Sequence, residues 1–258
     1  RLGTSLRDSR VDGIILDSCV SMDGSQKWAQ ELSGSAMPPV VSIENRIDAG
    51  LLSAVLVDSQ YWSGRITQHL IDIGRKNIFY IAGPLGIEHE LNRYKGYLDT
   101  MQSNGLPTNE NFLYEGDFSS GQAHNAVVSA LAKGLRFDAI QASNDQAAIG
   151  AVKALKENGI NVPGKVAVCG FDNLFPSTLI TPAITTVDVP RYEMGTAAVR
   201  EIVRRIEAPH TPPTHYILSA GMVIRASPNP DVTTEWNLAN CYSASSNSHT
   251  TDPHPLQN

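Results

Sequence analysis

The sequence predicts an α/β fold with parallel sheets that helices cover on both faces. Short apolar segments rich in β-branched residues recur along the chain, and stretches with helical spacing separate several of them. A crossover between parallel strands needs a dozen or more residues and usually forms a helix, so this alternation is typical of parallel sheets. The 258 residues are enough to bury a core in one domain or in two small lobes.

The expected strands follow one another along the chain. Each is a short apolar run, which is the pattern of a strand buried on both faces of its sheet. They cover residues 13–16, 40–43, 54–57, 77–82, 112–115, 139–142, 166–170 and 184–187.

Helices are expected between several of these strands, where apolar side chains recur at helical spacing. The spacing predicts helices over 62–73, 123–131 and 149–155. Gly74 follows the first of them and Gly159 the last, at the position where a residue with left-handed backbone commonly ends a helix. Two of the expected helices therefore have a predicted end.

Composition and charge exclude several classes of protein. The formal net charge is −6 and basic residues cluster only in pairs such as Arg204-Arg205, so this chain is not expected to bind DNA. Cys19, Cys169 and Cys241 are odd in number and widely spaced, which indicates neither a disulfide framework nor a zinc site and fits a reducing cytoplasm. No apolar run approaches the ~20 residues that span a bilayer, so no membrane partner is expected.

The two ends of the sequence differ from its middle. Residues 228–258 are rich in Ser, Thr, Asn and Pro, and we expect a disordered tail there without a coiled coil. At the start, a parallel sheet that begins at residue 13 would carry its first strand after only a dozen residues. This beginning indicates that part of the fold lies upstream.

Segments along most of the chain resemble the LacI/GalR family of transcription repressors, in the family's order and at its spacing. The resemblance spans about residues 5–228. It rests on RVDGIIL (10–16), PPVVSIEN (38–45), HLIDIGRKNIFYIAGP (69–84), NRYKGY (92–97), EGDFSSG (115–121), ASNDQAAIGAVKAL (142–155), VAVCGFDN (166–173), TPAITTV (181–187), MGTAAV (194–199) and MVIRASP (222–228).

The resemblance implies a fold like that of type I periplasmic sugar-binding proteins. Two Rossmann-like lobes would be joined by three crossovers, with a ligand in the cleft between them. The N-terminal lobe would comprise 1–57 and 190–217, and the C-terminal lobe 58–189 and 218–227. The family's helix-turn-helix head, its hinge helix and the first strand, helix and second strand of its core have no counterpart here. We therefore expect an incomplete N-terminal lobe with an exposed edge strand at 13–16, either because the chain is a fragment or because its start was set too late.

Several candidate ligand-binding residues come directly after predicted strands, where ligands of open α/β sheets bind. Asn144 and Asp145 follow one strand and Asp172 another, and their short side chains suit the hydroxyls of a sugar. Strand-end Asn and Asp also commonly cap the next helix. The resemblance favours ligand contact for Asn144 and Asp172, and Asp145 is expected to be the cap.

Three further candidates match ligand-contacting positions of the family. Arg93 lies in NRYKGY, where the family has a ligand-gripping arginine, although a single arginine is commonly a solvated surface residue. Phe118 matches an aromatic residue that lies against the ligand, and its alternative is a core Phe. Glu44 matches a position where relatives often have Asp, and it could instead be a solvated loop acid.

The last two candidates match positions that contact ligand in some members of the family or differ from it in residue type. His89 falls where some relatives contact ligand, but an exposed loop histidine is the favoured interpretation. Arg191 stands near the third crossover, where some sugar repressors place an aromatic residue, so a phosphorylated or acidic sugar is also possible. Relatives that bind purines usually lack the Asn found at Asn144, which favours a carbohydrate.

No sequence signature of catalysis is found, and we predict no catalytic residue, metal site or cofactor. GxSxG, GxxxxGK[ST], GxGxxG and HExxH motifs are absent from the sequence. The resemblance implies the effector-binding core of a cytoplasmic, homodimeric repressor, with a sugar or sugar derivative as effector and operator DNA bound only through the missing head. A periplasmic sugar-binding protein of a transporter is the alternative, and a Rossmann-type enzyme is a second one. Arg93→Ala or Asp172→Ala should weaken effector binding and leave the fold intact.

Overall fold

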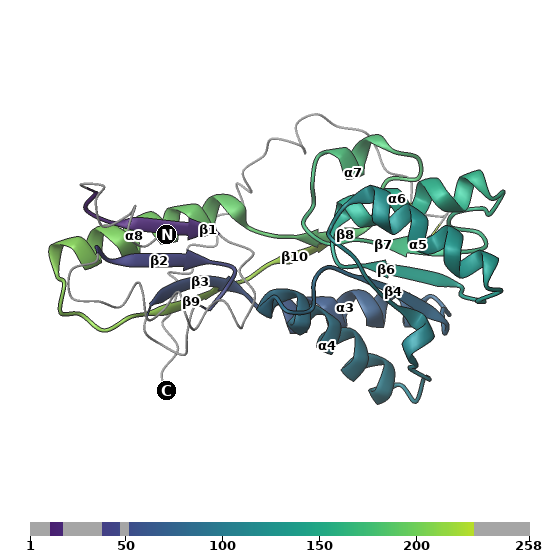
Figure 1. The fold of residues 1–258 in the computed structure, drawn as a ribbon, viewed down its shortest axis with the longest axis horizontal. Coiled ribbons are helices and arrows are strands. Elements are labelled where there is room, and N and C mark those ends of the chain that lie inside the picture. Colours follow the sequence, from purple (N-terminus) through teal and green to yellow (C-terminus); the bar gives the residue numbers. More distant parts are fainter. Residues whose placement is uncertain (1–10, 18–37, 47–51, 230–258) are drawn as a thin grey trace.

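The fold is described here from a computed structural model for residues 11–17, 38–46 and 52–229 (Figure 1). Two four-stranded parallel sheets lie towards opposite ends of the long axis of the molecule. The α/β class and the parallel sheets predicted from the sequence are confirmed. The predicted disordered tail falls outside the described residues from residue 230 onward.

The first sheet combines three early strands with one late strand. It has the order β1 (Ile14–Asp17), β2 (Val40–Ile43), β3 (Ser53–Val57) and β9 (His215–Leu218), and every neighbouring pair is parallel. Helix α8 (Arg191–Glu207) packs against this sheet. Within the described part of the chain, β1 pairs with β2 alone, so it is the edge strand that the sequence led us to expect.

The second sheet is built from consecutive strand–helix units. Its order is β5 (Leu113–Glu115), β4 (Ile78–Ala82), β6 (Ala139–Ala142) and β7 (Ala167–Cys169), again all parallel. Alternate residues of β4 enter two separate cores: Ile78, Tyr80 and Ala82 point to one face and Phe79 and Ile81 to the other. Because side chains of a strand alternate between its faces, both faces of this sheet must be covered.

Two pairs of helices cover the faces of the second sheet (Figure 1). Helices α3 (Ser59–Asp72) and α4 (Glu88–Ser103) pack together on one face, and α5 (Ser120–Ala132) and α6 (Asp145–Glu157) pack together on the other. The remaining short elements are η1 (Glu110–Phe112) and α7 (Pro176–Leu179).

Three connections run between the two sheets. β3 leads into α3, β8 (Thr186–Asp188) leads into α8, and β9 leads into β10 (Gly221–Val223), which pairs antiparallel with β8. All three are visible in the middle of Figure 1. The assignment of 1–57 with 190–217 and of 58–189 with 218–227 to two lobes stays a prediction.

The predicted elements form within a few residues of their expected bounds. Gly74 has a φ of +90° and Gly159 a φ of +70°, as expected for left-handed helix ends. The amide of Gly74 donates to the carbonyl of Ile71 at 2.8 Å, and the amide of Arg75 donates to that of Leu70 at 3.0 Å, which is the Schellman pattern. Helical spacing did not predict α4 or α8, because α4 is mostly polar and α8 has apolar side chains on more than one face.

Membrane-spanning helices and clusters of metal-ligating side chains are both absent from the described ranges. None of the helices there is long and apolar enough to cross a membrane. In the same ranges, no group of three or more His, Cys, Asp or Glu side chains is arranged to hold a metal ion.

Candidate ligand-binding site

The centre of the candidate site is Arg93, on the second turn of α4. Its side chain is buried, and Nη1 donates to Glu90 Oε1 at 3.2 Å and to the carbonyl oxygen of Ser143 at 2.7 Å. Nη2 lies 3.4 Å from Asp172 Oδ1, and the guanidinium carbon lies 3.9 Å from the centre of the Phe171 ring. Burial opposes the charge, but the surrounding carboxylates outweigh it and hold the pKa of Arg93 above its usual value. Arg93 is therefore a fixed cation and not a solvated surface residue.

Glu90 is the structural partner of Arg93 and was not among the residues predicted from the sequence. Its side chain has no exposed surface, and Oε2 accepts a hydrogen bond from the amide of Gly83 at 2.8 Å. Burial raises the pKa of Glu90, while Arg93 and the Gly83 amide lower it. An acid three residues before a base on one helix face is a recognisable pair, so the Glu90–Arg93 spacing carried a signal.

Asp172 stands just past β7 in an unusual backbone conformation. Its φ is +105° and that of Asn173 is +55°, in the region that side-chain-bearing residues rarely adopt. The Asp172 side chain keeps 21% of its surface exposed, and its carbonyl oxygen accepts a hydrogen bond from the exposed Arg191. Burial raises the pKa of the Asp172 carboxyl, and Arg93 and Arg191 lower it. The turn thus holds one carboxylate beside two guanidinium groups.

Asn144, and not Asp145, is the cap of α6. Asn144 Oδ1 accepts a hydrogen bond from the amide of Ala147 at 2.8 Å, and Nδ2 donates to the carbonyl oxygen of Phe118 at 3.2 Å. Asp145 is already helical, and its carboxylate accepts hydrogen bonds from Thr186 Oγ1 at 2.6 Å and from the amide of Leu174 at 2.7 Å. The prediction that Asp145 is the cap is wrong, because the cap is the last residue with extended backbone, and that residue is Asn144.

Arg93, Glu90, Phe171 and Asp172 form what we call the Arg93 cluster, and Phe118 and His89 flank it. Phe118 has a φ of +71°, and its ring centre lies 6.4 Å from that of His89. His89 is buried in the first turn of α4, where Nδ1 lies 3.0 Å from Asn45 Oδ1. The favoured interpretation of His89 as an exposed loop histidine is therefore wrong. The Phe118 ring packs directly against Gly83. Only a residue without a side chain fits there, because an added Cβ would lie 2.3 Å from the ring.

Glu44 approaches this cluster from the other sheet. It follows β2 with a φ of +65°, and its side chain is half-buried. Burial raises the pKa of Glu44, the charge of Arg93 lowers it, and Asp172 raises it. The charge of Glu44, which follows a strand of the first sheet, therefore interacts with those of Arg93 and Asp172.

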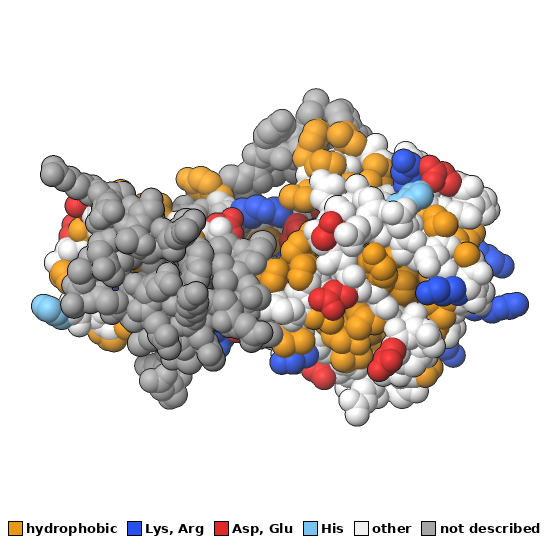
Figure 2. Space-filling view, viewed as in Figure 1, with side chains coloured by type: hydrophobic (Ala, Val, Ile, Leu, Met, Phe, Trp, Pro, Cys, Tyr) orange, Lys and Arg blue, Asp and Glu red, His pale blue; other side chains and the backbone are white. Residues whose placement is uncertain are grey.

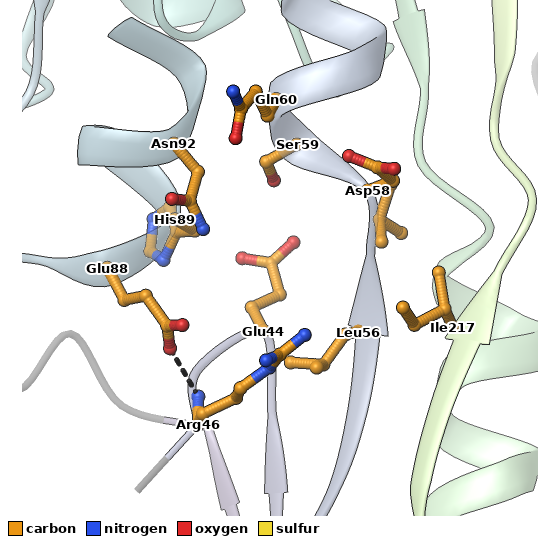
Figure 3. Close-up of a pocket in the computed structure, with 11 residues that line it drawn as sticks. Glu44, Arg46, Leu56, Asp58, Ser59, Gln60, Glu88, His89, Asn92 and Ile217 are labelled. Carbon is orange, nitrogen blue, oxygen red and sulfur yellow. Dashed lines mark hydrogen bonds between the residues drawn. The ribbon is translucent and has the colours of Figure 1, made fainter. Parts of the chain in front are cut away.

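A polar pocket adjoins the cluster, and we call it the side pocket (Figure 3). Its volume is about 310 Å³, at the lower end of the ~300–1,000 Å³ that is usual for small-molecule sites. The Glu44 side chain points from the end of β2 towards the first turns of α3 and α4 (Figure 3). The lining residues are Glu44, Arg46, Leu56, Val57, Asp58, Ser59, Gln60, Glu88, His89, Asn92 and Ile217.

The seven predicted candidates fall into two adjoining groups. Five of them belong to the Arg93 cluster or its surroundings, and two line the side pocket. Arg93, Asp172 and Arg191 are linked directly, and Asn144 is linked to Phe118. Glu44 and His89 line the side pocket, which the other five do not. In the space-filling view, basic and acidic side chains lie next to one another in a hollow between the two ends of the molecule (Figure 2). Such an arrangement can bind a ligand that offers both hydrogen-bond donors and acceptors.

Two parallel sheets joined by three connections, with a charged site between them, define a ligand-binding α/β core. Comparison with known proteins identifies its family. The profile of the periplasmic binding protein-like domain matches residues 67–228. The chain therefore belongs to the periplasmic binding protein-like domain family, and its relatives are transcriptional regulators of the LacI family.

Three of these relatives illustrate the similarity. Catabolite control protein A of Priestia megaterium is 32% identical over 200 residues, which cover 76% of this chain and 58% of the relative. The HTH-type transcriptional repressor PurR of Actinobacillus pleuropneumoniae is 30% identical over 203 residues, 78% of this chain and 59% of the relative. The solved structure of the transcriptional regulator CelR in complex with cellobiose gives a TM-score of 0.81 at 28% identity, over 88% of this chain and 68% of that one. The chain thus spans less than two thirds of both sequence relatives.

The buried His89 provides a test of the site's electrostatics. Burial, followed by the charge of Arg93, lowers the pKa of His89 to about 3. As the pH falls below about 6.5, His89 takes up a proton in the unfolded chain but stays neutral in the folded protein. The contribution of His89 to the free energy of unfolding is therefore complete above pH 6.5 and decreases as the pH falls towards 3. We expect the stability difference between the wild type and His89→Gln to change by ~1 kcal/mol per pH unit between pH 6 and 4.

Urea unfolding at several pH values measures this difference. The exposed His210→Gln is the matched control for the loss of a histidine side chain. Parallel stability profiles for His89→Gln and the wild type would show that His89 is not held neutral.

Proposed function

We propose that this chain is the effector-binding core of a LacI-type transcription regulator and that its effector is a sugar or sugar derivative. The observation that carries the proposal is the Arg93–Asp172 pair, which the Glu90 carboxylate, the Ser143 carbonyl and the Phe171 ring hold in place. A guanidinium donates in a fixed fork and a carboxylate accepts, and together these groups suit neighbouring hydroxyls of a sugar. The cellobiose complex of the structural relative supports a carbohydrate.

Glu44 would allow one effector molecule to bind residues from both sheets at the same time. It comes from the end of β2, whereas Arg93 and Asp172 belong to the second sheet's side of the site. A ligand held by all three favours one angle between the sheets and shifts the population towards it. A ligand held by one sheet alone would bind every angle equally and shift nothing.

The wider activity belongs to the same proposal. In a complete regulator, this shift would alter how a DNA-binding segment outside the described core holds its operator, and such a protein works in the cytoplasm as a homodimer. Exposed apolar side chains on α8, among them Tyr192, Val199 and Val203, support an association surface. The repressor relatives favour regulation over transport. Binding without turnover is the expected activity.

Asp172→Asn tests the site with little disturbance of the fold. Asparagine has nearly the same shape and tolerates left-handed backbone, so the turn at φ +105° should persist. Loss of the charged acceptor should lower sugar affinity about tenfold or more, in keeping with hydrogen bonds to charged groups. Calorimetric titration with the best sugar from a thermal-shift panel measures the change.

The exposed Asp12→Asn is the matched control and should bind sugar like the wild type. Unchanged affinity in Asp172→Asn, with a melting temperature near that of the wild type, would remove Asp172 from the site.

A further inference from the structure

The side pocket contacts both halves of the molecule. Leu56 and Ile217 come from strands of the first sheet and Glu44 directly follows another, whereas Ser59 and Asn92 come from helices that cover the second. Close by, the amide of Arg46 donates to Glu88 Oε2 at 2.8 Å, across the same boundary. A molecule in this pocket would therefore touch the two sheets at once, as a population-shifting ligand must.

The side pocket adjoins the Arg93 cluster and does not stand apart from it. Glu44 lines the pocket and also lies in the electrostatic field of Arg93 and Asp172. His89 lines the pocket as well, and its ring lies beside that of Phe118. A polar pocket that adjoins a group of charged side chains, with Glu44 and His89 between the two, can hold one unit of a ligand whose next unit contacts the partly exposed Asp172.

The charges that line the side pocket are mainly negative. Its lining has the three carboxylates of Glu44, Asp58 and Glu88 and the single guanidinium of Arg46. His89 adds no positive charge near neutral pH, because burial lowers its pKa to about 3. In the adjoining cluster, the Arg93 guanidinium already faces the carboxylates of Glu90 and Asp172. A phosphate group in this pocket would meet like charge, whereas a hydroxyl would find acceptors.

Glu44 is the acceptor that the protein leaves open. Asp58 Oδ1 accepts from the amide of Tyr61 at 2.9 Å, and Glu88 Oε2 accepts from the Arg46 amide. No hydrogen bond to the Glu44 carboxylate is found among the described residues, although its side chain is half-buried and points into the pocket (Figure 3). A partly buried carboxylate without a hydrogen-bond donor is stabilised by a ligand that supplies one.

We infer that the effector is an uncharged carbohydrate of at least two linked units, one at the Arg93–Asp172 pair and the next in the side pocket, where Glu44 accepts a hydroxyl. This inference rests on the proposed function. It excludes sugar phosphates, which the exposed Arg191 by itself would have favoured. The specificity for an unphosphorylated and extended ligand is thus assigned to Glu44 and the side pocket.

The test compares neutral mono- and disaccharides with the corresponding sugar 6-phosphates by thermal shift and calorimetric titration. We expect a neutral disaccharide to bind best. The affinity for its 6-phosphate should be lower by a factor of about ten or more. Glu44→Gln should reduce that preference for the neutral sugar, because it removes one of the carboxylates that would repel a phosphate group in the side pocket. Asn92→Ala should lower disaccharide affinity about fivefold and leave monosaccharide affinity unchanged, because Asn92 lines the side pocket, where the second unit would bind.

The exposed Glu207→Gln is the matched control for the loss of one negative charge, and it should bind every sugar like the wild type. If a phosphorylated sugar or a single sugar unit binds best, the inference is wrong and the proposed function stands. It is also wrong if Asn92→Ala affects both ligand sizes equally or neither. If none of the sugars binds, the proposed function itself fails.

Discussion

Arg93→Ala is expected to lower the free energy of unfolding by about 3–5 kcal/mol at pH 7, the usual effect of removing one partner of a buried ion pair. Glu90 has no exposed surface, and Arg93 is the cation within reach of its carboxylate. Without Arg93, the charged Glu90 would keep the hydrogen bond from the amide of Gly83 but would lose its cation. The structure therefore changes the earlier expectation that this substitution leaves the fold intact, because Arg93 supports the site that it also serves.

The effect of Arg93→Ala should depend on pH in a defined direction. Burial raises the pKa of Glu90 and Arg93 lowers it, so the substitution raises that pKa further. A raised pKa in the folded state means that the folded protein binds the proton more readily than the unfolded chain. The loss of stability should be small below the ordinary value of 4.5 and should grow as the pH rises towards 7.

Urea unfolding of Arg93→Ala and of the double variant Glu90→Gln with Arg93→Ala measures this effect. The double variant removes the buried charge as well, so it should recover a large part of the lost stability at pH 7. Sugar affinity should stay low in both variants, because the guanidinium is absent from both. Equal stability of the single and double variants would mean that the charge of Glu90 is not the cause.

Gly96→Ala is the second substitution with a large expected effect. Helices α3 and α4 approach so closely at this point that an added Cβ would lie 2.0 Å from the carbonyl oxygen of Gln60 and 3.0 Å from the amide nitrogen of Gly64. Backbone atoms cannot move aside like a flexible side chain, so the helices must separate. We expect a loss of ~3 kcal/mol or more, at the upper end of the usual cost of overpacking.

The thermal midpoint and urea unfolding of Gly96→Ala measure this loss. Gly121→Ala, in α5, is the matched control, because nothing lies within 4 Å of its added Cβ. That variant should equal or slightly exceed the wild type in stability, since alanine favours helix. If Gly96→Ala does not accumulate as folded protein while Gly121→Ala does, the prediction also holds. Equal stability of the two variants would contradict the close approach of α3 and α4.

Strands such as β4, β6 and β7 could be predicted closely from sequence because they are buried on both faces and have few polar residues. The expected strand at 139–142 coincides with β6, and the expected strand at 184–187 differs from β8 by one or two residues at its ends. By contrast, β9 and β10 were not predicted, because both are short and only partly buried. The sequence pattern therefore predicts a strand well where complete burial requires nearly all of its residues to be apolar.

The candidate site was predicted unevenly for a related reason. Arg93 and Asp172 follow from motifs, and Asn144 from its place after a strand, but pattern could not show which of Asn144 and Asp145 caps the helix. Of the residues that line the side pocket, only Glu44 and His89 were predicted. Its residues Asp58, Ser59, Glu88 and Asn92 stand at helix starts far apart in the sequence, and no motif joins them.

Local order along the chain was sufficient to establish the α/β class, the run of buried strands and the glycine ends of two helices, because each depends on residues a few positions apart. Packing between distant segments established the rest. It places the charge of Glu44, from the first sheet, within the influence of Arg93 and pairs Arg93 with the buried Glu90. It also brings α3 and α4 into contact at Gly96. Such contacts depend on distances in space, and a one-dimensional pattern does not contain them.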